Sequence, residues 1–182
     1  MRPGGSKQKG SAFEREVCKQ LSRWVSHGKR EDLFWRSAMS GGRATVAGRR
    51  GKSLASQAGD ISSVDKAGHV LTADLYFETK HVKDIALDKF IVTGSGPLAN
   101  FWKIAQREAA AYDKSPVIIV RQNRFPTLLL AHDKIVELLH GTKHSARGKL
   151  AVIDYPGGKL ALWKFDAVTV VPFKYAEPVE AR

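Results

Sequence analysis

An apolar and aromatic segment that ends in charged residues is the feature that most constrains the fold of this chain. The segment runs from His69 to Lys80, and its composition predicts a β-strand. Side chains alternate between the two faces of a strand, so Glu78 and Lys80 share one face and Thr79 points to the other. Upstream of Glu78, with seventeen residues in between, the chain reads Gly-Asp, a pair that ends at Asp60. Pairing of the two segments in a hairpin would bring two carboxylates and an ammonium together.

These residue types suit a divalent metal beside a phosphodiester. Magnesium prefers oxygen ligands and keeps several waters, so we expect one carboxylate oxygen each from Asp60 and Glu78, with the Thr79 carbonyl as a third ligand. A bound metal lowers the pKa of a water and polarises a phosphoryl oxygen. Lys80 would orient that water or offset charge in the transition state. The expected cofactor is Mg²⁺, with Mn²⁺ as a substitute.

Each of these fragments also has a purely structural interpretation. Glu-Thr-Lys is common on solvated strand faces, and Gly-Asp is common in turns. Asp74 is a rival to Asp60, because it lies on the same predicted strand face as Glu78 and Lys80. The surrounding sequence is needed to choose between these readings.

The N-terminal region predicts a helix that opens near Lys9 and ends at Gly28. Ser11 followed three residues later by Glu14 is a capping-box pattern, which gives Glu14 a structural explanation. A short aromatic strand, Leu33 to Arg36, is expected next. The apolar face of the helix has helical spacing: Phe13, Val17, Leu21, Trp24 and Val25.

Residues 7–135 resemble the archaeal-type Holliday junction resolvases of the PD-(D/E)xK nuclease superfamily. The resemblance rests on residues 9–16 and 36–41, on Asp60, and on Glu78-Thr79-Lys80, and on the order of the expected elements. It implies an α/β fold with a central mixed β-sheet flanked by helices and a restriction-endonuclease-like core. Glycine stands at position 59, where the family usually has proline.

The resemblance also implies roles for individual residues. Glu14 would be the acidic residue of the first helix that faces the metal, Ser40 a loop serine near the scissile phosphate, and Lys80 the catalytic lysine. Asp60 and Glu78 would bind the metal. The family's glutamine on a later helix aligns securely with none of Asn100, Phe101 and Gln106.

The charge distribution favours a polyanionic partner. The chain carries a net charge of +12, and residues 1–59 hold thirteen Lys or Arg against four Asp or Glu. Excess positive charge beside the expected site is typical of DNA binding, although a solvated basic face is the simpler alternative. The expected DNA-binding residues are Lys7, Lys9, Arg36, Arg43, Arg49, Arg50, Lys52 and Lys83.

We expect residues 1–182 to form a single nuclease domain with three appended features. These are a basic N-terminal arm (1–10), a mobile basic loop (41–58) and a C-terminal β extension (141–182). Within the domain, helices are expected at 98–112 and 133–140, strands at 116–120, 127–131 and 167–173, and a hairpin formed by 150–154 and 160–165.

The function that fits these observations best is a Mg²⁺-dependent endonuclease that cuts branched DNA, as a homodimer resolving Holliday junctions. One alternative is a related nuclease acting on nicked, flap or duplex DNA. Another is a catalytically silent DNA-binding module. With the single cysteine Cys18, no signal-peptide pattern and no long apolar span, we expect a soluble, cytoplasmic protein.

Overall fold

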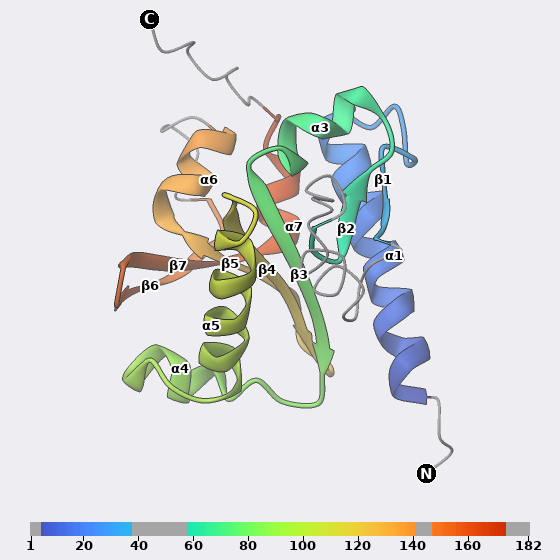
Figure 1. The fold of residues 1–182 in the computed structure, drawn as a ribbon. Coiled ribbons are helices and arrows are strands. Elements are labelled where there is room, and N and C mark those ends of the chain that lie inside the picture. Colours follow the sequence, from blue (N-terminus) through green and yellow to red (C-terminus); the bar gives the residue numbers. More distant parts are fainter. Residues whose placement is uncertain (1–4, 38–57, 141–146, 174–182) are drawn as a thin grey trace, which may run out of the picture.

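A five-stranded mixed sheet forms the centre of the computed structural model, which describes residues 5–37, 58–140 and 147–173 (Figure 1). The strand order is β3-β4-β5-β7-β6, and only the β3–β4 pair is parallel. Nearly continuous apolar runs form the inner strands, as expected for strands that are buried on both faces. The predicted fold class is confirmed. The strands are β3 (Leu75–Val82), β4 (Ser115–Gln122), β5 (Thr127–His132), β6 (Lys149–Tyr155) and β7 (Gly158–Lys164).

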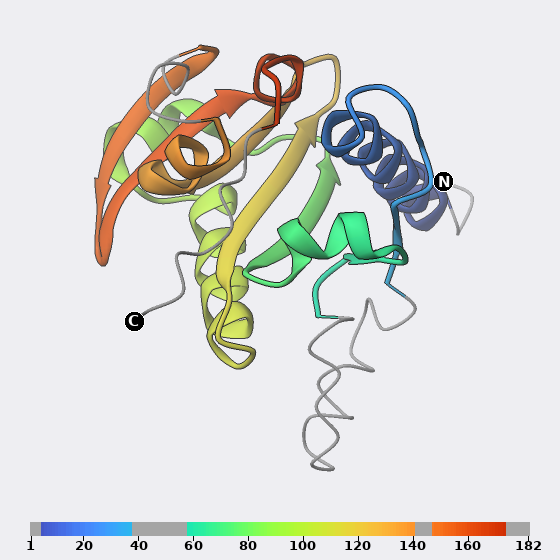
Figure 2. The same cartoon turned by 90° about the horizontal axis from the view of Figure 1, so that it is seen from above.

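Helices cover both faces of this sheet, because the side chains that alternate along each strand pack into two separate cores. One core joins α1, α6 and α7 to one face of the sheet, and the other joins α4 and α5 to the opposite face. Figure 2 shows β3 and β4 between α1 and α5. The helices are α1 (Gly5–Val25), α4 (Leu87–Thr93), α5 (Pro97–Ala110), α6 (Asp133–His140) and α7 (Phe165–Val170).

A small second sheet lies beside the edge strand β3. It consists of β1 (Phe34–Arg36) and β2 (Ile61–Ser63), which pair antiparallel. The Asp60 amide donates to the Phe77 carbonyl at 2.8 Å and so links this sheet to β3. Gly59 has φ +84°, and a Cβ there would lie 2.6 Å from the Phe77 carbonyl oxygen, so only glycine fits this approach. The link fixes the backbone of Asp60 against β3.

The strand predicted from His69 to Lys80 is wrong in its first half. Residues Lys66–Thr72 form helix α3, whose N-cap Asp65 accepts a hydrogen bond from the Ala67 amide at 2.9 Å. Strand β3 begins only at Leu75. The predicted hairpin is also wrong, because β2 pairs with β1 and meets β3 through Asp60.

Two further predictions at the ends of the chain are wrong. Helix α1 begins at Gly5, so Ser11 lies inside the helix and cannot cap it, and residues 5–10 of the expected arm are helical. The strand expected at 167–173 is replaced by α7. Helix α4 was not anticipated. The helices near 98–112 and 133–140, the strands near 116–120 and 127–131, and the β6–β7 hairpin are confirmed.

Candidate active site

Asp60, Glu78 and Lys80 come together at β3, as the sequence pattern predicts. One carboxylate oxygen of Asp60, Oδ2, accepts hydrogen bonds from the Thr79 amide at 2.8 Å and from Thr79 Oγ1 at 3.1 Å. The Lys80 ammonium donates to Glu78 Oε1, two residues away on the same strand face. The Glu78 residue is 8% exposed. The site is therefore a pair of carboxylates, buried Glu78 and partly buried Asp60, with one cation.

The pKa values of both carboxylates are raised, mainly by burial. Burial, and then the charge of Asp60, raises the pKa of Glu78 to about 7, although Lys80 acts in the opposite direction. Burial also raises the pKa of Asp60, against the stabilising hydrogen bond from the Thr79 amide. For Lys80, burial is the largest single influence and lowers the pKa, but the charge and hydrogen bond of Glu78, together with the charge of Asp60, outweigh it and the net shift is upward. One ammonium does not neutralise this pair.

The donor set fits a hydrated divalent cation. Mg²⁺ is usually held by one or two carboxylates and keeps several waters. Within residues 5–37, 58–140 and 147–173, no three His, Cys, Asp or Glu side chains gather in the manner of a protein-only metal site. Asp60 and Glu78, which one ammonium does not neutralise, match a Mg²⁺ site made of one or two carboxylates and waters. The Thr79 carbonyl as a third ligand stays a prediction.

Glu14 reaches the same region from α1. It forms an ion pair with Arg36 of β1, and its charge is one of the influences that raise the pKa of Asp60. The capping role predicted for Glu14 is wrong, because Ser11 is not at the helix start. Arg36 holds Glu14 beside the carboxylate pair, and its contact with DNA stays a prediction.

A family match covers nearly the whole chain. The pattern of the family described as "Phage putative PDDEXK endonuclease" matches residues 5–173. The chain belongs to this family. Membership supports a nuclease function, and nucleases of this superfamily generally use divalent metals. The superfamily prediction is thus confirmed, whereas the match gives no support to the narrower archaeal-type resolvase.

No curated protein and no solved structure matches the chain. No helix in the described ranges is long and apolar enough to cross a membrane.

The basic residues predicted to bind DNA have varied surroundings in this PDDEXK endonuclease. Lys9 donates to Asn123 Oδ1 in the turn after β4, and Lys83 is exposed just beyond β3. Lys7 lies within α1, but its side chain is outside what the structure describes. The predictions for Ser40, Arg43, Arg49, Arg50 and Lys52 also lie outside the described residues.

Asp74 is separated from the carboxylate pair. It precedes β3, is exposed, and its carbonyl accepts the Ser115 amide at 2.8 Å. Four residues of strand separate it from Glu78, roughly 13 Å. The side chain that lies against Glu78 and Lys80 is therefore Asp60, not the rival.

Three residues near the site were missed from the sequence. Tyr76 donates its hydroxyl to Glu108 Oε2 of α5 at 2.7 Å, and the Glu108 charge raises the pKa of Glu78. The Lys80 ammonium lies 6.0 Å from the centroid of the Phe101 ring. Phe101 and Glu108 are seven residues apart, two helical turns, which is the signal that places both on one face of α5.

Gln106, one of the residues considered for the family's glutamine, faces elsewhere. Its Nε2 lies 3.6 Å from the position that a Cβ would take at Gly157, in the β6–β7 turn. Glu108 and Phe101 therefore bring α5 to the site, and Gln106 does not.

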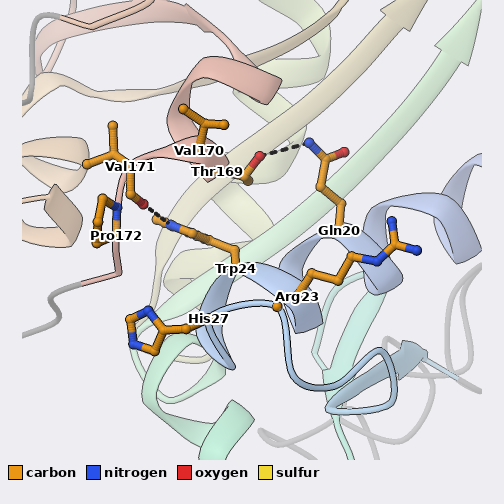
Figure 3. Close-up of a pocket in the computed structure, with 9 residues that line it drawn as sticks. Gln20, Arg23, Trp24, His27, Thr169, Val170, Val171 and Pro172 are labelled. Carbon is orange, nitrogen blue, oxygen red and sulfur yellow. Dashed lines mark hydrogen bonds between the residues drawn. The ribbon is translucent and has the colours of Figure 1, made fainter.

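A hollow of about 410 Å³ between α1 and the end of α7 is a separate feature (Figure 3). Trp24 Nε1 donates to the Val171 carbonyl at 2.7 Å and Gln20 Nε2 to Thr169 Oγ1 at 2.8 Å, so both helices are joined there. None of Asp60, Glu78 and Lys80 lines this hollow. It is not the active-site cavity.

Proposed function

We propose that this chain is a Mg²⁺-dependent endodeoxyribonuclease, with Mn²⁺ as a substitute, that hydrolyses phosphodiesters at Asp60, Glu78 and Lys80. The observation that carries the proposal is the pair of carboxylates formed by buried Glu78 and partly buried Asp60, which Lys80 alone does not neutralise. Burying an unbalanced charge is costly unless a counter-ion is supplied. A divalent cation supplies it.

When bound, the cation supplies positive charge that polarises a phosphoryl oxygen and lowers the pKa of a water. The chain's own groups hold the arrangement. Thr79 fixes one oxygen of Asp60 through its amide and hydroxyl, and leaves the other oxygen, Oδ1, for a ligand. The Lys80 ammonium is held by Glu78, where it stabilises negative charge that develops on a phosphate. Glu14 contributes further negative charge beside Asp60.

For the substrate we propose branched DNA, including four-way junctions, cut by a homodimer. The supporting observation is the excess of positive charge in residues 1–59. Basic side chains contact phosphates without reading sequence, and two-fold symmetry pairs two active sites for opposing strands. In this proposal Ser40 lies near the scissile phosphate, and Arg43, Arg49, Arg50 and Lys52 contact the backbone.

The test is cleavage of end-labelled four-way junction, flap, nicked and continuous duplex DNA by purified protein, with Mg²⁺ or with a chelator. We expect metal-dependent nicks, most frequent in the branched substrates. Asp74→Asn is the matched control for Asp60→Asn, because it removes the same charge from an exposed position before β3. Absence of cleavage of every substrate with Mg²⁺ and with Mn²⁺ would contradict the proposal.

A further inference from the structure

Trp35 is a large aromatic side chain that the fold leaves in solvent. It is 61% exposed on β1, whereas the other three tryptophans, Trp24, Trp102 and Trp163, are at most 5% exposed. Tryptophan is usually well buried, since its ring carries a large apolar surface. Trp35 lies in a three-residue strand beside the candidate active site. A ligand that covers its ring would remove this apolar surface from water.

The small β1–β2 sheet has two unlike faces. Phe34 and Ile61 are 1% exposed and belong to the core under α1, and Arg36 on the same face pairs with Glu14 of that helix. Trp35 alternates to the opposite face, where it is paired with Ser62. Packing against α1 thus fixes the sheet and directs Trp35 away from the core.

The register places Trp35 close to the carboxylate pair. Trp35 is directly opposite Ser62, and the Ser37 amide donates to the Asp60 carbonyl at 2.8 Å, so the pairing continues to Asp60. Residues in this diagonal relation are about 7–8 Å apart, within reach of an aromatic side chain. The indole therefore lies within about one nucleotide of a phosphate bound at Asp60.

We propose that Trp35 is a stacking platform for a nucleobase adjacent to the scissile phosphate. The inference rests on the proposed nuclease function and names the class of substrate. Every base offers a π-face, so stacking on an exposed aromatic side chain does not depend on sequence. The net charge of +12 favours DNA over a protein partner as the occupant of this face.

A base can stack on Trp35 only if one of its faces is free of the duplex stack. Continuous duplex DNA offers such a face only after unstacking of a base step, which costs free energy. A junction, flap, gap or single strand offers it at little cost. The substrate is therefore DNA in which base stacking is interrupted at the cleavage point.

Fluorescence tests this directly, because Trp35 is the one tryptophan open to solvent. The full-length Asp60→Asn protein, which we expect to bind without cutting, is titrated with gapped and with continuous duplexes of equal length, and iodide quenching is measured in each complex. We expect the gapped duplex to quench the emission and protect Trp35 from iodide, and the continuous duplex to do neither. Equal responses to both duplexes would overturn the inference.

Affinity of the variants gives the second readout. Trp35→Ala should weaken binding of the gapped duplex about ten- to a hundredfold and of the continuous duplex less than threefold, while Trp35→Phe recovers most of the loss. Phe125→Ala removes another exposed aromatic side chain, in the β4–β5 turn, and should change neither affinity. A uniform loss for both duplexes, or a change of oligomeric state in Trp35→Ala without loss of affinity, would overturn the stacking role.

The two proposals fail separately. If wild-type protein cuts DNA but Trp35→Ala binds the gapped duplex normally, the stacking inference alone is wrong. If wild-type protein cuts nothing but the gapped duplex still quenches Trp35, the nuclease proposal is wrong and this chain binds interrupted DNA without cleaving it.

Discussion

Two groups of charged residues beside α1 and β3 differ in how fully the chain neutralises them. Arg121 of β4 donates to both carboxylate oxygens of Glu16, at 2.8 and 2.5 Å, and to Thr127 Oγ1 at 2.9 Å. Its guanidinium also lies 4.7 Å from the centroid of the Phe13 ring. Among the residues that the structure describes, Lys80 is the one cation bonded to the carboxylate pair of Asp60 and Glu78.

The pKa shifts of the two groups run in opposite directions. The hydrogen bond from Arg121 lowers the pKa of Glu16, so its charged form is stabilised by folding. Burial raises the pKa of Asp60 and of Glu78, so their charged forms are disfavoured by folding. The first group ties α1 to the sheet, and the second carries negative charge that burial disfavours. The direction of the pKa shift thus distinguishes a carboxylate whose charge stabilises the fold, Glu16, from the two that we propose bind a metal.

The largest expected effect is on cleavage by Asp60→Asn. We expect a loss of more than a hundredfold, or more than about 2.7 kcal/mol of transition-state stabilisation, with DNA binding intact or tighter because one negative charge is removed. Glu16→Gln, which alters the other group, should cleave DNA at the normal rate. Single-turnover kinetics on one cleaved substrate compares them. Equal activity of the two variants would show that the two groups do not differ in their role in cleavage.

Lys80→Ala should come next, with a loss of about a hundredfold in the single-turnover rate. The ammonium is the only described cation bonded to the pair, and it cannot be replaced by a side chain already present there. Lys89→Ala is the matched control, because it removes an exposed lysine of α4 that is not among the expected DNA-binding residues. A normal rate in Lys80→Ala would show that its contact with Glu78 is structural.

The residues of the candidate site were easier to bring together from the sequence than the elements that hold them. Asp60 and Glu78 follow from a short pattern whose residue types are fixed by chemistry. The first half of the strand predicted at His69–Lys80 is wrong, because a short apolar run does not distinguish a helix from a strand. The N-cap at Asp65 favours the helix there. The strand predicted at 167–173 is wrong, because burial of Phe165 and Val168 in helix α7 overrides the strand propensity of the β-branched residues.

Contacts between distant segments were beyond sequence reasoning. Glu14 pairs with Arg36, and Tyr76 with Glu108, through the packing of α1 and α5 on the sheet. Neither partner is adjacent in the chain, so the local pattern at Ser11 and Glu14 suggested a cap instead. The register that places Trp35 near Asp60 likewise depends on how β1 pairs with β2.

The metal-free protein should lose stability as the pH rises. Between pH 4.5, the ordinary pKa of Glu78, and its folded value of about 7, folded Glu78 keeps a proton that the unfolded chain has released. Stability therefore falls through this window, by on the order of 2–3 kcal/mol. Urea unfolding in chelator at pH 5 and pH 8 measures it. The decline should be smaller in Glu78→Gln, and an equal decline in both proteins would assign it to other groups.

The smallest effect concerns the neutralised group. Glu16→Gln should lower the free energy of unfolding by about 1 kcal/mol at pH 7, since Glu16 is half-exposed and solvent screens the pair. Because Arg121 lowers its pKa, the contribution of Glu16 is present above the ordinary value and disappears as the pH falls through the folded value. Urea unfolding at pH 7 and pH 3 checks this. If Glu16→Gln is more stable than wild type at pH 7, the charge of Glu16 destabilises the fold, as we expect for Asp60 and Glu78, and the contrast between the two groups is wrong.

The most direct test of the account is the melting temperature of wild-type and Glu78→Gln protein at pH 8, each with chelator and with Mg²⁺. We predict that metal-free Glu78→Gln melts several degrees above metal-free wild type, because the buried charge is gone. Mg²⁺ should raise the melting temperature of wild type and leave that of Glu78→Gln unchanged. If Mg²⁺ raises both equally, or Glu78→Gln melts lower without metal, the buried pair is not a site for a divalent cation.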